Sequence, residues 1–343
     1  MITLENNGLT VRFPGVHPQA TCRVEFQRTL RLPDDGKDHP LPPGFGRFPL
    51  HHVDDFPRVP EDWRRHGGVF LPMHPDEALW INFSADYPMA VKIAAGKINA
   101  LTGESWDEAL HPDPQDYCVL PMQPWLDGFC VAPGEVRQFV AMPLGEGYTA
   151  EEQITGKGEV GGLQFLFHPL RADAYERWRR PPPSPRAAAM DGPALDHLDL
   201  CFDLYDEAPM AAEAAPDMGL APGGRLVQEI YNDPFQPADW EAGVRSRCFV
   251  HLANASTYLA ITGRNPPPPP REAREYAKQG GAWFVYEDPD AGMLEGSETL
   301  AGLSSVDQWR RQKRREVADD EPLEVGPVVK LGPGRGAVRD GEF

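Results

Sequence analysis

Histidine and aspartate side chains cluster near residue 50. His51 and His52 precede Asp54 and Asp55, and imidazole and carboxylate groups are common ligands for zinc, iron or manganese. On an extended strand neighbouring side chains point to opposite faces, so His52 and Asp54 could share an ion but His51 and His52 could not. The alternative is a loop in which the aspartates begin a turn before Pro57. We expect this loop, without metal or other cofactor. The rival hypothesis is a metal-dependent enzyme that uses the His51 to Asp55 region, with His52 and Asp54 as candidate ligands.

A second group of candidate residues lies within the segment 123–138. Trp125 offers an aromatic face, and Asp127, Arg137 and Gln138 offer polar groups near it. Sugars and peptides are commonly recognised by an aromatic ring beside hydrogen-bonding groups, so these four residues are candidate ligand-binding residues. The alternative is a hairpin with a turn around Asp127 and with Trp125 packed inward. We expect the inward position for Trp125 and keep a glycan-binding module as an alternative function.

Signals for catalysis are weak elsewhere in the sequence. The chain has no G-x-S-x-G nucleophile elbow, and none of its glycine-rich pieces ends in the Lys-Ser or Lys-Thr pair of a phosphate-binding loop. Acid–base catalysis by paired carboxylates stays open, because the pairing of distant residues is invisible in a sequence. The sequence therefore favours a protein that is not an enzyme.

The charge of the chain limits its partners. It carries 52 acidic against 33 basic side chains, a formal net charge of −19, which repels nucleic acid and anionic membrane surfaces. The one dense basic run, from Arg310 to Arg315, is followed directly by acidic residues and predicts a solvated helix. We expect no nucleic-acid partner and no membrane partner.

Cysteine usage and hydropathy indicate a cytoplasmic protein. The five cysteines are widely spaced and include no C-x-x-C pair, so they predict neither a disulfide framework nor a zinc site. The N-terminal segment lacks the features of a signal peptide, and no stretch has the roughly 18 apolar residues of a membrane span. We therefore expect a soluble chain in the cytoplasm.

The elements that would position these candidates are strands. Period-two alternation is clear at Cys22 to Phe26, at Leu79 to Phe83 and at Leu163 to Phe167, and the segment 89–101 predicts two strands folded about Ala95-Gly96. Helical periodicity is nearly absent from residue 1 to about residue 170. The pattern predicts a mainly β fold, an antiparallel sandwich or jelly-roll-like structure with few short helices.

Composition divides the chain into four parts. We predict a β-sandwich-like domain over 1–170, an Ala- and Pro-rich linker over 171–222 containing a strand near 198–206, and a second, smaller β-rich segment with a short helix over 223–305. Within that segment the five prolines at 266–270 predict a stiff spacer. The remainder, 306–343, is expected to be a charged helix and a disordered tail.

Two long motifs carry a resemblance. They are QPWLDGFCVAPGEVRQFVAMPLGEGYTAEEQITGKGEVGGLQ and APGGRLVQEIYNDPFQPADWE. The chain resembles a conserved but functionally unassigned family of soluble bacterial and fungal proteins, over residues from about 25 to 305. The resemblance implies a shared module, and it implies no catalytic residue because no activity is known for the family.

These observations together predict a non-catalytic protein that acts by binding or self-assembly. Its partner would be another protein or a second copy of the chain, since exposed sheet edges are natural places for pairing. The acidic surface would keep such a chain soluble.

Overall fold

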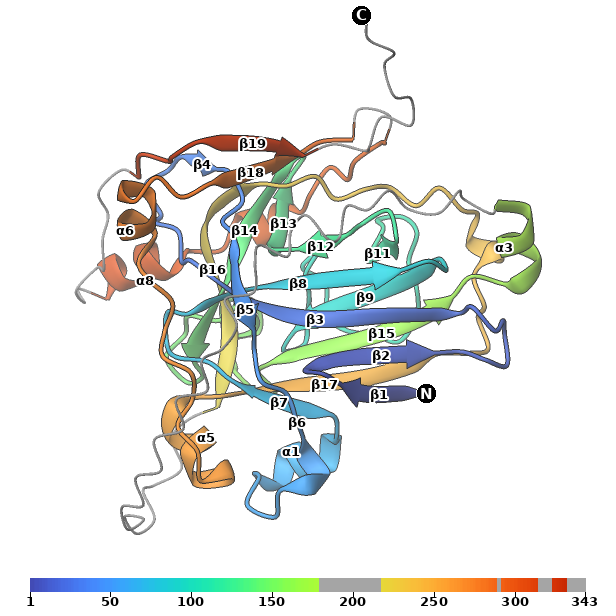
Figure 1. The fold of residues 1–343 in the computed structure, drawn as a ribbon, viewed down its shortest axis with the longest axis horizontal. Coiled ribbons are helices and arrows are strands. Elements are labelled where there is room, and N and C mark those ends of the chain that lie inside the picture. Colours follow the sequence, from blue (N-terminus) through green and yellow to red (C-terminus); the bar gives the residue numbers. More distant parts are fainter. Residues whose placement is uncertain (179–216, 289–290, 314–322, 332–343) are drawn as a thin grey trace, which may run out of the picture.

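The computed structural model describes residues 1–178, 217–288, 291–313 and 323–331. It is mainly β, as the alternation predicts, with one sheet of 17 strands and a second sheet of two (Figure 1). Most strand pairs in the large sheet are antiparallel; the pairs β4–β16 and β7–β17 are parallel.

The strand pairings divide the large sheet into two halves. One half contains β1 (Ile2–Glu5), β2 (Gly8–Arg12), β3 (Thr21–Thr29), β4 (Asp38–His39), β5 (Gly44–Arg47), β8 (Ala78–Ala85), β12 (Trp125–Leu126), β13 (Gly128–Ala132), β14 (Glu135–Pro143) and β16 (Met218–Val227). The other contains β6 (His51–His52), β7 (Val69–Pro72), β9 (Met89–Ala95), β10 (Ile98–Asn99), β11 (Tyr117–Leu120), β15 (Leu163–Pro169) and β17 (Ser246–Ala253). A single pair, Met218 with Leu252, joins β16 to β17.

The two halves pack face to face as a sandwich. Phe26 of β3 meets Phe165 of β15 edge to face, with ring centroids 5.7 Å apart, although these strands do not pair. Alternate residues of β3 are buried and β9 is buried throughout, as expected where one strand has a solvent face and the other is covered on both sides.

Short helices surround the sandwich, and a two-stranded sheet lies against one end (Figure 1). The helices are α1 (Glu61–His66), α2 (Ala150–Thr155), α3 (Ala172–Trp178), α5 (Ala255–Thr262), α6 (Ala273–Lys278), α7 (Glu298–Ala301) and α8 (Val306–Gln312), with 3-10 turns η1 (Val53–Asp55) and η2 (Pro237–Asp239). The small sheet pairs β18 (Trp283–Tyr286) with β19 (Val328–Leu331) in parallel. No helix of the described residues is long and apolar enough to cross a membrane.

The strands predicted from alternation are present. Cys22 to Phe26 lies in β3, Leu79 to Phe83 in β8 and Leu163 to Phe167 in β15. The hairpin predicted about Ala95-Gly96 joins β9 to β10, and Gly96 adopts a φ of +59° there. The left-handed backbone at this turn explains the glycine.

Strands from both predicted β-rich segments pair with one another in the large sheet. β14 pairs with β16 and β15 pairs with β17. β16 begins at Met218, inside the range predicted as a linker. The rest of that linker over 179–216, including the strand predicted near 198–206, lies outside the described residues, as does most of the predicted tail. The tail is predicted to be disordered, but its residues 328–331 form β19 by pairing with β18.

The predicted charged helix is present as α8, but it is not fully solvated. Arg310 lies 2.5 Å from Asp76, and Arg31 lies 2.7 Å from Asp307, so ion pairs tie the helix to the sandwich. Arg311 is exposed. The end of the basic run, from residue 314, lies outside the described residues.

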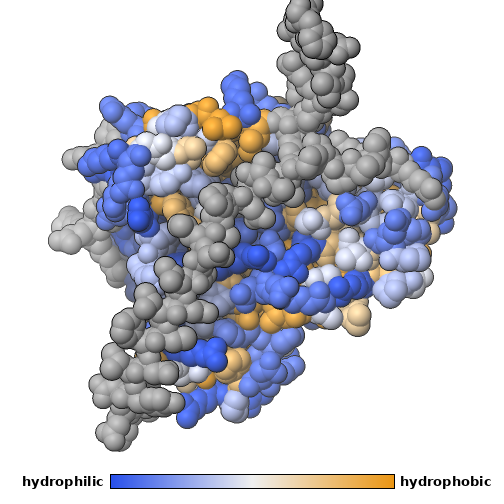
Figure 2. Space-filling view, in the orientation of Figure 1, coloured by the Kyte–Doolittle hydropathy of each residue, from blue (hydrophilic) through white to orange (hydrophobic). Residues whose placement is uncertain are grey.

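The surface in view is mostly hydrophilic. In Figure 2 a hydrophobic area lies near the top of the molecule, over β18 and β19, and smaller hydrophobic areas lie elsewhere on this face. Val328 and Val329, 45% and 42% exposed, belong to β19.

Buried glutamines connect segments that are not paired as strands. The Gln123 amide donates to the carbonyl oxygens of Trp125 and Glu229, and its oxygen accepts from the Tyr231 backbone N–H at 3.1 Å. Likewise, the Gln115 amide donates to the Tyr231 carbonyl oxygen, and its oxygen accepts from the Asp233 N–H. Because buried backbone groups need partners, these amides replace strand pairing for the chain after β16.

Replacing Gln123 by Met tests this role. Methionine has a similar length but lacks the amide, so the variant leaves backbone groups of residues 229 and 231 without these partners and should lower the free energy of unfolding by about 2 to 3 kcal/mol. Urea denaturation measures the loss. Gln279→Met, at an exposed glutamine, is the control and should change stability by no more than about 0.5 kcal/mol; equal effects of both would contradict the role.

Candidate functional site

Two arginines face each other across neighbouring strands. Arg137 of β14 and Arg225 of β16 are direct cross-strand partners, next to an irregularity in the register between residues 137 and 139. Side chains opposite each other in an antiparallel pair share a face, and like charges in such positions destabilise the sheet. The pairing therefore needs compensation by an opposite charge.

The protein supplies little of that compensation to Arg137. Its side chain is 6% exposed, its Nη1 is buried without a hydrogen-bond partner, and its guanidinium forms no ion pair with any described residue. Arg225 does form an ion pair, with its Nε 3.3 Å from Glu135 Oε1, although this buried Nε has no hydrogen-bond partner. Burial lowers the pKa of Arg137, while the charge of Asp34 acts in the opposite direction. A buried, unpaired charge is costly.

Both arginines line a cavity of about 350 Å³. Its other lining residues are Asp34, Asp35, Gly36, Gln308 and the exposed Arg311. We call this space the Arg137 cavity. Its lining is almost entirely polar and combines three guanidinium groups with two carboxylates.

The chain after β3 brings the carboxylates to the cavity. Gln138 holds this segment, because its amide donates to the Leu30 carbonyl at 2.8 Å and accepts from the Leu32 N–H at 3.0 Å. Gly224 allows the close approach, since a Cβ there would lie 2.5 Å from the Pro33 carbonyl oxygen. Gln138 of β14 thus positions the segment after β3, which forms the cavity wall that the neighbouring Arg137 faces.

The two carboxylates differ in their own partners. Asp35 receives hydrogen bonds from the His39 ring at 2.9 Å and from the Lys37 N–H at 3.0 Å; burial raises its pKa, but these bonds outweigh burial and lower it overall. Asp34, 8% exposed, accepts a hydrogen bond from the Ser305 hydroxyl and forms no ion pair with a described residue. Asp34 therefore lines the cavity without an ion-pair partner among the described residues.

Helix α8 closes another side of the cavity. Ser305 caps the helix and Gln308 completes a capping box, so the backbone N–H groups of Ser305 and Gln308 have partners. Gln308 and Arg311 are three residues apart and so lie on one side of the helix, toward the cavity.

The four candidate residues of the segment 123–138 separate in the structure. Arg137 lines the cavity and Gln138 holds its wall, whereas Trp125 is 7% exposed and packs edge to face on Tyr286 at 5.1 Å. Asp127 is buried and accepts from the Gln228 amide at 2.7 Å. The chain does not turn at Asp127: β12 pairs with β8, then β13 pairs with β14.

The histidines near residue 50 lie elsewhere on the surface. His52 and Asp54 are exposed, and neither has a hydrogen-bond partner for its side chain among the described residues. His51 is half-buried, and its Nε2 lies 2.8 Å from the Tyr258 hydroxyl; burial lowers its pKa.

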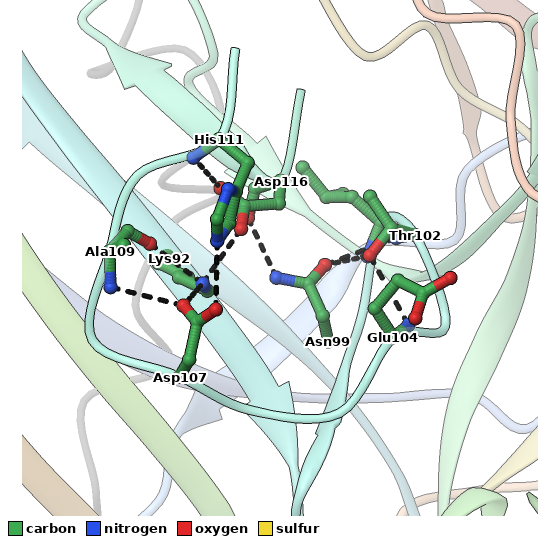
Figure 3. Close-up of polar contacts among 9 residues, drawn as sticks. Lys92, Asn99, Thr102, Glu104, Asp107, Ala109, His111 and Asp116 are labelled. Carbon is green, nitrogen blue, oxygen red and sulfur yellow. Dashed lines mark hydrogen bonds and ion pairs between the residues drawn. The ribbon is translucent and has the colours of Figure 1, made fainter. Parts of the chain in front are cut away.

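A different cluster meets the distance requirement for a metal site. Within the described part of the chain, Asp107, His111 and Asp116 form the one group of three potential ligands that lie within 4.8 Å of one another. Figure 3 shows that the Lys92 ammonium already lies among them, 2.6 Å from Asp107, 2.7 Å from Asp116 and 2.8 Å from the Ala109 carbonyl. All three N–H donors of the lysine are used. The cluster therefore anchors the loop before β11 over β9.

Comparison with known proteins gives no relative. No family model, no curated protein and no solved structure matches the chain. The resemblance to an unassigned bacterial and fungal family thus stays a prediction, and function has to be derived from the site geometry.

The buried Asp127 yields a prediction about pH. Burial raises its pKa to about 7, although the Gln228 and Trp125 side chains act in the opposite direction, whereas an unfolded aspartate titrates near pH 3.9. The folded state therefore binds the proton more tightly, and the contribution of Asp127 to stability is lost as the pH rises from about 4 through about 7. Asp127→Asn should become progressively more stabilising relative to the wild type over this interval.

Urea denaturation of both proteins across that pH interval measures the difference. Asp54→Asn, at an exposed aspartate, controls for the loss of one acidic side chain from the surface. A difference between Asp127→Asn and the wild type that does not change with pH would show that the carboxyl is not held protonated by burial.

Proposed function

We propose that this protein is a non-catalytic binding protein and that its ligand is a small anion held in the Arg137 cavity. The observation that carries the proposal is the buried Arg137 guanidinium, which faces the cavity opposite Arg225 and has no partner of its own. An anion between the two groups would compensate both charges.

The chemistry of the cavity supports an anionic ligand. A guanidinium presents donors in a fixed plane that matches the two oxygens of a carboxylate or phosphate. The volume of about 350 Å³ lies at the lower end of the range for small-molecule sites, so the ligand is compact. A large polyanion would also be repelled by the net charge of −19.

The same lining residues favour binding over catalysis. Among the described residues that line the cavity, none carries a thiol or imidazole, and Asp35 is engaged by His39. Arginine does not release its proton in the physiological pH range. These groups recognise and orient a charged molecule.

Replacing Arg137 by Met separates a binding role from a structural one. The variant removes an unpaired buried charge while keeping a long side chain, so without added ligand it should be more stable than the wild type by about 1 kcal/mol or more. It should also lose any stabilisation by small anions, because a ligand stabilises only the state that binds it.

Thermal denaturation with and without inorganic phosphate and a panel of small carboxylates measures both effects, and calorimetry gives the affinity of each active compound. Arg171→Met is the matched control, since Arg171 is exposed and pairs with Asp173. The proposal fails if Arg137→Met is strongly destabilised without added ligand, or if anions stabilise the variant as much as the wild type.

A further inference from the structure

The Arg137 cavity contains an unpaired charge of each sign. Arg137 has no ion pair, and Asp34, across the cavity lining, has none with a described residue. The two groups influence each other electrostatically, yet they form neither a hydrogen bond nor an ion pair within 4.0 Å. Opposite charges removed from water normally pair.

Their anchors explain why they stay apart. Arg137 extends from β14 in the middle of the sheet, between β13 and β16. Asp34 is held by the Ser305 hydroxyl at the start of α8, on a segment fixed by Gln138. A molecule that fills the space and carries both charges would satisfy the two groups at once.

We infer that the ligand is a small zwitterion, with a carboxylate or phosphate for Arg137 and Arg225 and an ammonium group for Asp34. This inference rests on the proposed binding function and specifies its ligand class. A free amino acid or an aminoalkyl phosphate has this chemistry and suits a cavity of about 350 Å³.

An ammonium group fits Asp34 better than a neutral donor does. A hydroxyl would donate one hydrogen bond but would leave the carboxylate charge uncompensated in a partly desolvated site. An ammonium supplies both the donor and the charge, and hydrogen bonds between ionised groups are about twice as strong as those between neutral groups. Asp35 offers less, because His39 and Lys37 already donate to it.

Matched pairs of compounds test the inference by isothermal titration calorimetry on the full chain. One arm compares each of the common L-amino acids with the carboxylate that lacks its amino group, and a second arm compares phosphoethanolamine with ethyl phosphate. In the arm that contains the true ligand class, the amino compound should bind at least about tenfold more tightly than its partner. The arm that responds identifies carboxylate or phosphate as the anionic end.

Asp34→Asn tests whether Asp34 causes the preference for the amino compound. Asparagine can still accept the Ser305 hydrogen bond but carries no charge, so this variant should lose the preference and keep the affinity for the compound without an amino group. Asp54→Asn, at an exposed position outside the cavity, should keep the preference of the wild type.

The outcomes separate this inference from the proposed function. If the wild type binds the amino and non-amino members of every pair equally, the zwitterion inference is overturned. Anion binding in the cavity is still supported in that case, provided that Arg137→Met abolishes the binding of both members. Absence of binding by all these compounds and by inorganic phosphate overturns both. The comparison within the wild type needs no variant, so a folding defect in Asp34→Asn cannot hide the answer.

Discussion

The side-chain amide of Gln138 determines where the charges of the site lie. By bonding the backbone on both sides of Arg31, it holds the chain after β3 against the middle of β14. That contact places Asp34 on the wall of a cavity that the neighbouring Arg137 also lines. Because Gln138 is fully buried, its two hydrogen bonds have no competition from water. Geometry that depends on such bonds is stiff, which suits a binding site.

This geometry has an energetic cost that folding alone does not explain. Two arginines stand opposite each other, and a buried guanidinium has no partner. Another buried cation of the same protein, Lys92, has three acceptors. Functional sites commonly retain unfavourable local interactions because the ligand compensates them. The contrast between Lys92 and Arg137 is the reason to regard one cluster as a loop anchor and the other as a site.

The sequence predicted the sandwich better than the site. Alternation identified β3, β8 and β15 because their residues face a core on one side or both, and that property is local. Arg137 was a candidate, but for its nearness in sequence to Trp125. Its actual neighbours are distant in sequence: Arg225 meets it through strand pairing, and Asp34 is brought to it by the hydrogen bonds of Gln138 to the chain after β3. Buried glutamines such as Gln123 gave no signal either, because a polar residue between strands is typical of a loop.

Crystallography with an anomalous anion tests the central claim most directly. Crystals of the full chain soaked in selenate, a phosphate-like oxyanion, should show an anomalous peak between the Arg137 and Arg225 side chains, with N–O distances of about 2.7 to 2.9 Å. The same peak should be absent from crystals of Arg137→Met. A cavity without the anion, together with an Arg137 guanidinium paired directly with Asp34 or Glu135, would contradict the account.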